Sequence, residues 1–154
     1  MNSWINGATS RDGVLALLPD IGSAYESLCA ALWQQPHLPG EVLELCRLRL
    51  AQLHGSEVEL SRSEVALAAA QRDALADWHR EDAITAAQKA CLSFTEVYAM
   101  DAGAITDEHA EAVKVHFGDA GLVMLIEALG VFDGMVRLSL LWRLPLNGSR
   151  EGKR

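Results

Sequence analysis

The chain has 154 residues, of which 50% are apolar, and is typical of one compact domain over residues 1–154, with a core over about 20–144 and a flexible tail over 145–154. The formal charge of −8, without a cluster of basic residues among aromatic ones, argues against nucleic-acid binding. The first 19 residues hold no basic segment followed by an apolar run, so they do not resemble a secretory signal, and we expect a cytoplasmic protein.

Helical periodicity dominates the sequence, and no segment alternates strictly between apolar and polar residues, so we predict an all-α fold. The first long helix is predicted over residues 20–34, ahead of the helix-breaking Pro39-Gly40 pair. The next is predicted over residues 41–54, where Gly55 can adopt the left-handed conformation that ends many helices.

Two capping boxes follow that glycine and compete as the start of the next helix. In a capping box a serine hydroxyl accepts from the backbone N–H three residues later, and an acidic side chain at that position reaches back. Ser56 with Glu59 fits this pattern, and so does Ser61 with Glu64. We expect Ser56 to be a helix cap rather than a nucleophile, because Glu59 is expected to cap the helix and not to activate the hydroxyl.

The second half of the chain contains further helix signals. Residues 71–81 are predicted to form a short helix and a connection. Thr85 with Gln88 is another capping box, at the start of a helix that runs to about residue 98. Thr106, followed by two acidic residues, suits the positive end of one more helix.

The longest apolar stretch, residues 121–144, is separated from the preceding helix by Gly118. Glu127, Asp133 and Arg137 interrupt this stretch, and each charge would be costly in hydrocarbon. We therefore predict a buried helix and no membrane contact.

The same three charged residues recur with Gly130 and Gly134 at steps of three and four, so they form a stripe along one face of the last helix. We weigh two roles for this stripe. One is a ligand or interface site formed by Glu127, Asp133 and Arg137. The other, which we favour because structural ion pairs are common, is an Asp133–Arg137 pair beside a helix crossing.

Projection of residues 41–54 as a helix gives one arc that faces the core and an opposite side that carries Glu44, close to Arg47. The residues on the core arc are Val42, Leu43, Leu45, Cys46, Leu50 and Leu53. Taken alone, this projection favours Glu44 as a solvated carboxylate beside Arg47, because most charged residues on helices are surface residues.

The cysteines and histidines show no recognised metal or disulfide spacing. Cys29, Cys46 and Cys91 include no CxxC pair, which favours reduced thiols. The five histidines include no HxxxH or HExxH pair, so we expect no metal and no other cofactor. His54 lies near a helix end, where we expect it to interact with backbone carbonyls.

The run ELCRLRLAQLHGSEVELSRS, residues 44–63, together with FTEVYA and HFGDAGLVMLIEALGVFDGMVR, resembles the alkylhydroperoxidase D (AhpD) and carboxymuconolactone decarboxylase family. In the family's redox members a glutamate is followed twelve residues later by a cysteine, three later by a second cysteine and four later by a histidine. The same steps lead here from Glu44 to Ser56, Glu59 and Ser63, so the glutamate is kept while both sulfurs and the imidazole are absent. The resemblance implies a multihelical AhpD-like fold of about six to eight helices in one domain, assembled as a dimer, trimer, hexamer or other homo-oligomer.

Three functions follow from these residues. The favoured one is a family member that has lost thiol peroxidase (peroxiredoxin-type) activity and binds a small molecule or serves as a structural homo-oligomer, because a serine cannot pass through the oxidation cycle of a thiolate. The second is a non-redox enzyme of the decarboxylase type, in which Glu44 or His54 handles a proton beside a nearby arginine. The third is alkylhydroperoxide reductase activity relocated to one of the three cysteines, which the expected burial of Cys46 and Cys91 opposes.

Overall fold

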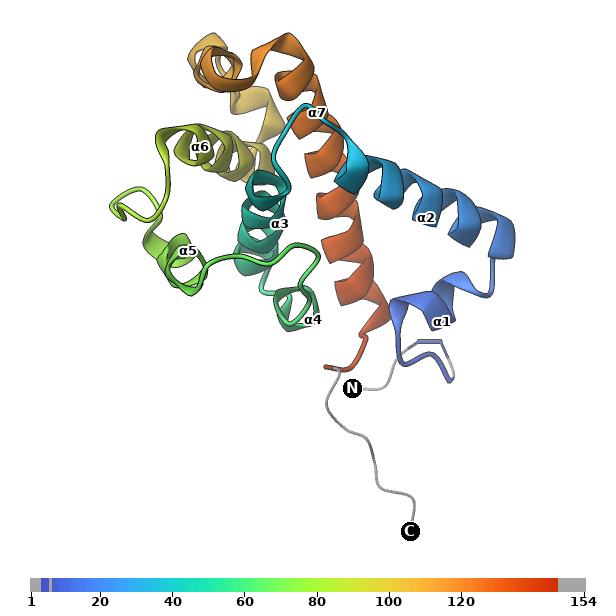
Figure 1. The fold of residues 1–154 in the computed structure, drawn as a ribbon. Coiled ribbons are helices and arrows are strands. Elements are labelled where there is room, and N and C mark those ends of the chain that lie inside the picture. Colours follow the sequence, from blue (N-terminus) through green and yellow to red (C-terminus); the bar gives the residue numbers. More distant parts are fainter. Residues whose placement is uncertain (1–3, 6, 147–154) are drawn as a thin grey trace.

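The computed structural model describes residues 4–5 and 7–146, so most of the predicted tail lies outside the described residues. Within this part the chain is all-α, as predicted, with seven α-helices, two 3-10 helices and no strand (Figure 1). The α-helices are α1 (Arg11–Leu15), α2 (Pro19–Gln34), α3 (Gly40–His54), α4 (Glu57–Leu60), α5 (Ala69–Ala74), α6 (Ala86–Met100) and α7 (Asp107–Trp142). The 3-10 helices are η1 (Leu75–Asp77) and η2 (Ala102–Ala104).

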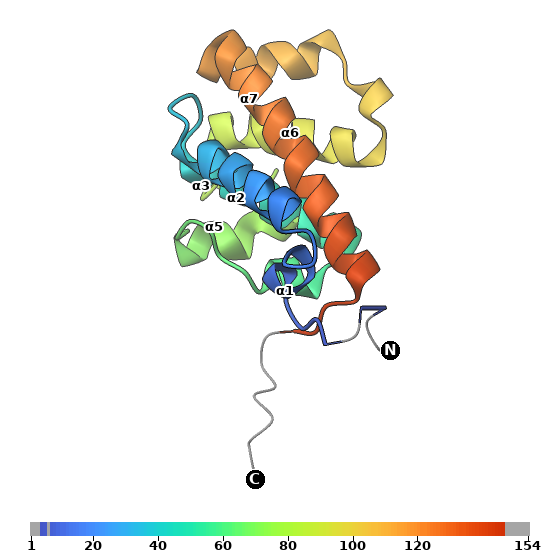
Figure 2. The same cartoon turned by 90° about the vertical axis from the view of Figure 1, so that its right-hand side faces the viewer.

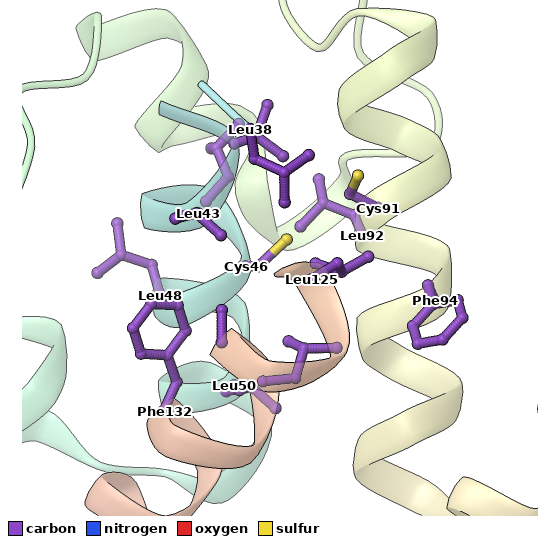
Figure 3. Packing of buried hydrophobic residues seen from close by; sticks show 14 of the residues in the cluster. Leu38, Leu43, Cys46, Leu48, Leu50, Cys91, Leu92, Phe94, Leu125 and Phe132 are labelled. Carbon is purple, nitrogen blue, oxygen red and sulfur yellow. The ribbon is translucent and has the colours of Figure 1, made fainter. Parts of the chain in front are cut away.

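The core forms where α3, α6 and α7 pack against one another (Figure 1). Residues 42–48 of α3 are all buried, so this part of the helix is enclosed on every side. The projection had predicted burial on one arc only. Cys46 is fully buried and lies close to Leu125 of α7 and Leu92 of α6 (Figure 3). Cys91 of α6 is also fully buried, so both cysteines are core residues, as expected.

The helix ends follow most of the predicted signals. Thr85 and Thr106 each begin a helix with a complete capping box. Gly55 ends α3 in the left-handed conformation, with a φ of 68°. Of the two starts that competed after this glycine, Ser56 is the cap of α4, whereas Ser61 lies at the C-terminal end of that helix.

The 36-residue helix α7 bends at Gly118, which has a φ of 67° and a ψ of −174°. This backbone conformation is open essentially to glycine alone, so the predicted break at this residue is present within one long helix. By length and composition α7 could cross a membrane. One side of α7 packs against α3 and α6, whereas Val123, Ile126 and Leu140 are exposed, so the predicted buried helix is buried on one side.

Helix α2 lies at the edge of the bundle, away from α6 (Figures 1 and 2). Of its 16 residues, Gly22 and Leu32 are buried. It contacts α1 and α7, and α7 in turn contacts α4. These four helices come from the beginning, the middle and the end of the chain, and they surround the pocket described below.

Candidate functional site

Glu44, the one residue of the redox motif that is kept, forms a buried ion pair with Arg47. Both side chains lie within α3 and are almost completely removed from solvent. Two nitrogens of Arg47, Nε and Nη2, donate to the two carboxylate oxygens of Glu44, each over 2.8 Å. The prediction of a solvated carboxylate is therefore wrong. Helix α4 and the loop after it cover this side of α3, which a projection of one helix cannot reveal.

Arg47 also holds the covering segment in place. Its Nη1 donates to the backbone carbonyl of Glu59 over 3.0 Å, and its Nη2 donates to that of Arg62 over 2.9 Å. The backbone N–H of Glu64 donates to Glu44 over 3.2 Å. Both carboxylate oxygens of Glu44 are thus occupied, which suits a structural anchor better than a general base.

Glu59 occupies the position where the family resemblance places the second redox cysteine, and its carboxylate is buried among cations. Its Oε1 accepts from Arg11 Nη2 over 2.6 Å and from the hydroxyl of Ser139 over 2.7 Å. Its Oε2 lies 3.5 Å from Arg47 Nη1 and 3.9 Å from Arg62 Nε. Four segments that are distant in the sequence therefore meet at one carboxylate.

Ser56 caps α4 as predicted, whereas Glu59 does not return the capping interaction. The hydroxyl of Ser56 accepts from the backbone N–H of Glu59 over 3.4 Å. The N–H of Ser56 donates instead to the carbonyl of Ala51, so the Glu59 side chain is left for the ion cluster. Ser63, at the family's histidine position, is exposed and donates to the carbonyl of Val65 over 3.3 Å. The predicted reciprocal cap by Glu59 is therefore wrong. Ser56 caps a helix, whereas Ser63 hydrogen-bonds within the loop that follows it.

A pocket of about 300 Å³ opens beside Glu59, between α1, α2, α4 and α7. Its polar side is formed by Arg11, Asp12, Arg47, Glu59, Arg62 and Glu64. Its other side is mainly apolar and aromatic, and comprises Leu15, Trp33, Val131, Phe132 and Met135. Trp33 of α2 and Phe132 of α7, which both line the pocket, stack on each other at a centroid distance of 5.4 Å.

Cys29 and Tyr25, from the inner side of α2, also line this pocket. Burial raises the pKa of the Tyr25 hydroxyl, and the neighbouring Cys29 raises it further. Burial likewise raises the pKa of Cys29, although its hydrogen bond with Tyr25 opposes this shift. At neutral pH Cys29 is therefore a thiol and not a thiolate, which makes it a weak nucleophile.

The charges around Glu59 include more donors than the protein uses. Among the described residues, the buried Nε atoms of Arg11 and Arg62 have no hydrogen-bond partner. Arg62 also pairs with Glu64 over 2.8 Å. Burial raises the pKa of Glu64, but the hydrogen bond and positive charge of Arg62 outweigh this effect, so the pKa of Glu64 is lowered. The polar side of the pocket is thus rich in guanidinium groups.

The second predicted constellation lies elsewhere, where the end of α3 meets α7. His54 Nε2 lies 2.6 Å from Asp133 Oδ1, and Arg137 Nε donates to Asp133 Oδ2 over 2.8 Å. The favoured Asp133–Arg137 pair is therefore present. His54 was expected to interact with carbonyls, and this is wrong, because a carboxylate from α7 reaches its ring. Glu127, the third residue of the predicted stripe, is exposed.

The structure thus separates the residues that the sequence grouped as catalytic. Glu44 pairs with Arg47 in the buried ion cluster beside α4, whereas His54 lies at the C-terminal end of α3 and pairs with Asp133 of α7. Neither residue lines the pocket. Within the described part of the chain, no three His, Cys, Asp or Glu side chains come together as a metal site requires.

Most residues of the pocket carry no signal in the sequence. Arg11, Tyr25, Trp33 and Ser139 were not identified, because each lies far along the chain from Glu59 and follows no motif spacing. One signal was available: an acidic residue in the place of a redox cysteine needs a cation or a donor nearby if it is buried.

The sequence matches no model of a known protein family and no curated protein. Among solved structures, the chain is similar to a protein of unknown function from Agrobacterium tumefaciens, described as a putative antioxidant defence protein AhpD. The TM-score is 0.76 at 19% identity, over 95% of this chain and 100% of that one. It is also similar to the debrominase Bmp8 in complex with 2,3,4-tribromopyrrole, with a TM-score of 0.75 at 14% identity, over 89% of this chain and 76% of that one. The chain therefore has the all-α AhpD-like fold.

Proposed function

We propose that this AhpD-like chain is a non-redox protein that binds a small organic molecule in the pocket beside Glu59. One observation carries the proposal. At the position of the second redox cysteine stands a buried carboxylate, held by Arg11 and Ser139, on the edge of a cavity of about 300 Å³. Such a volume lies at the lower end of the usual range for small-molecule sites.

The thiols of the chain support the loss of peroxidase activity. Peroxide reduction requires a thiolate that attacks the peroxide oxygen and a second thiol that resolves the product. Burial raises the pKa of Cys46 to about 12 and also raises that of Cys91. Cys29 faces the pocket, but the pKa of its thiol is raised too. No pair of thiols in the described chain therefore matches the requirements of the redox cycle.

The lining of the pocket favours a small ligand with an apolar body and one polar group. Trp33 and Phe132 line its apolar side, where an aromatic or heteroaromatic ring of the ligand can contact them. The arginines around Glu59 offer donors to an acceptor atom at one end of such a molecule. The tribromopyrrole bound by the structurally similar debrominase is a molecule of this chemical type, so it is a reasonable first probe.

A decarboxylase-type enzyme that uses Glu44 is less well supported, because Glu44 is fully paired and does not line the pocket. We place the protein in the cytoplasm, because its three cysteines are free and disulfides are rare there.

The experiment compares the wild-type protein with Ala30→Trp and Ala112→Trp. Ala30 lines the pocket from an exposed position on α2, so a tryptophan there fills the cavity without entering the core. Ala112 is an exposed residue of α7 that does not line the pocket, and it provides the matched control. We expect small aromatic probes, 2,3,4-tribromopyrrole among them, to raise the melting temperature of the wild type and of Ala112→Trp but not that of Ala30→Trp.

Equal shifts in all three proteins, or no shift in the wild type with any probe, would contradict ligand binding in this pocket. Thiol-dependent turnover of a hydroperoxide is measured in parallel. We expect no turnover by the wild type, and clear turnover would overturn the loss of redox activity.

A further inference from the structure

The carboxylate of Glu59 has one oxygen that the protein satisfies and one that it does not. Oε1 accepts two hydrogen bonds, from Arg11 and from Ser139. Oε2 accepts none from the described residues, because its contacts with Arg47 Nη1 and Arg62 Nε, at 3.5 and 3.9 Å, are longer than a usual hydrogen bond. The enclosed side-chain atoms that lack a partner in the described chain are Arg11 Nε and Arg62 Nε. Oε2 is therefore not enclosed, and it is open to the pocket that Glu59 lines.

Helix α7 fixes where this oxygen lies relative to the apolar part of the pocket. Phe132, Met135 and Ser139 follow one another at steps of three and four residues, so they share one face of α7. Phe132 and Met135 line the pocket, whereas Ser139 holds the carboxylate of Glu59. Ser139 lies about 10 Å beyond Phe132 along the helix axis, at a rise of ~1.5 Å per residue. The pocket thus has an aromatic end and, toward the C-terminal end of α7, an end with an unused acceptor.

We infer that the pocket selects neutral ligands whose aromatic body carries an N–H or O–H group, and that this group donates to Oε2 of Glu59. The inference rests on the proposed binding function and names the polar group of the ligand. A buried acceptor without a donor is costly, so a ligand that supplies the donor is favoured over an analogue that lacks it. Phenols and azoles with an N–H are the chemical class that suits both ends of the pocket.

The charges around Oε2 favour a neutral donor over a charged group. Both ion-pair contacts of Oε2 are with arginines, so an ammonium group against this oxygen would meet two positive charges. An ionised carboxylate on the ligand has no proton to donate, and it would meet the negative charge of Glu59. The side chain of Glu59 is 3% exposed, so the solvent screens these interactions little.

The first test compares two probes of the same bicyclic shape on the full-length wild type. Indole carries an N–H, and benzofuran has a ring oxygen in its place. Isothermal titration calorimetry measures both affinities. We expect indole to bind about tenfold to a hundredfold more tightly than benzofuran, which is the usual contribution of a hydrogen bond to a charged group.

Two results of this comparison would overturn the inference. Equal affinities for the two probes, with both lost in Ala30→Trp, would leave the pocket proposal standing but not the role of Oε2. This is the result expected if Arg62 turns its Nε onto Oε2 and satisfies it. Binding of neither probe would also overturn the inference, whereas the pocket proposal is judged by its own wider set of probes.

The second test replaces the acceptor by a donor with Glu59→Gln. The amide oxygen keeps the hydrogen bonds from Arg11 and Ser139, so the amide NH2 takes the place of Oε2. We expect this variant to lose the preference for indole over benzofuran. It should bind quinoline, whose ring nitrogen accepts but does not donate, about threefold to tenfold more tightly than the wild type does.

Glu57→Gln is the matched control for this substitution. Glu57 is an exposed residue of the same helix, α4, and does not line the pocket, so the control should keep the preference of the wild type for indole. Circular dichroism shows whether both variants are folded. An undiminished preference for indole in folded Glu59→Gln would overturn the inference. If Glu59→Gln does not fold, the comparison of indole with benzofuran on the wild type decides.

Discussion

Replacement of Arg47 by methionine tests whether the kept motif residue Glu44 is an anchor of the fold. The variant removes four hydrogen bonds of 2.8 to 3.0 Å, two to the Glu44 carboxylate and two to backbone carbonyls. It leaves a fully buried carboxylate whose remaining hydrogen bond comes from the N–H of Glu64. Breaking a buried ion pair by removing one partner costs about 3–5 kcal/mol. We expect Arg47→Met to lose that amount, a large part of the roughly 5–15 kcal/mol that stabilises a typical domain.

Urea unfolding followed by circular dichroism measures this loss, and Arg49→Met is the matched control. Arg49 lies on the same helix and pairs with Glu96, but both side chains of that pair reach solvent. The control should lose less than Arg47→Met, because the Glu96 carboxylate that it leaves unpaired keeps contact with solvent. Equal losses in the two variants would refute the anchoring role of Arg47. The double variant Glu44→Leu with Arg47→Met should be more stable than Arg47→Met alone, because no buried charge is left unpaired.

Three further predictions concern other parts of the fold. Of the three thiols, Cys29 alone should react with a thiol reagent in the native protein. Its reaction rate should rise steeply with pH, because the pKa of the thiol is raised. Reaction of all three thiols without denaturant would contradict the buried positions of Cys46 and Cys91. Gly118→Ala should lower the free energy of unfolding by about 1–3 kcal/mol, because the φ of Gly118 is positive. Gly130→Ala should raise it by up to ~1 kcal/mol, because Gly130 lies in regular helix with open space at its Cβ position. Urea unfolding measures both changes, and equal effects would be inconsistent with the bend in α7. Because the pKa of Glu64 is lowered in the folded protein, its carboxylate contributes stability above the ordinary glutamate pKa, and this is lost as the pH falls through the lowered pKa. Glu64→Gln should therefore make the free energy of unfolding depend less on pH in the acid range. An unchanged pH dependence would argue against the Arg62–Glu64 pair.

The sequence was sufficient wherever a signal was local to one helix. The caps at Thr85 and Thr106, the end of α3 at Gly55 and the burial of Cys46 all depend on residues within a few positions of one another. The fold class follows from the same local periodicity.

The candidate site could not be predicted in this way because its interactions are between distant segments. Projection of α3 placed Glu44 on the side away from the core, but α4 and its loop cover that side. The carboxylate of Glu59 accepts hydrogen bonds from Arg11, which lies 48 residues earlier, and from Ser139, which lies 80 residues later. His54 finds its partner, Asp133, 79 residues further along the chain. Contacts between residues this far apart produce no periodic pattern in the sequence.

The carboxylate of Glu59 joins α1, α4 and the C-terminal part of α7, and this has a consequence for synthesis on the ribosome. Ser139 is among the last residues of the described chain to be made, so the core of α3 and α6 can collapse while this carboxylate still lacks one of its donors. A chain that stops shortly before Ser139 would retain most of the apolar core. It would nevertheless leave the buried Glu59 carboxylate without one of its donors, which favours local opening of the structure at α4.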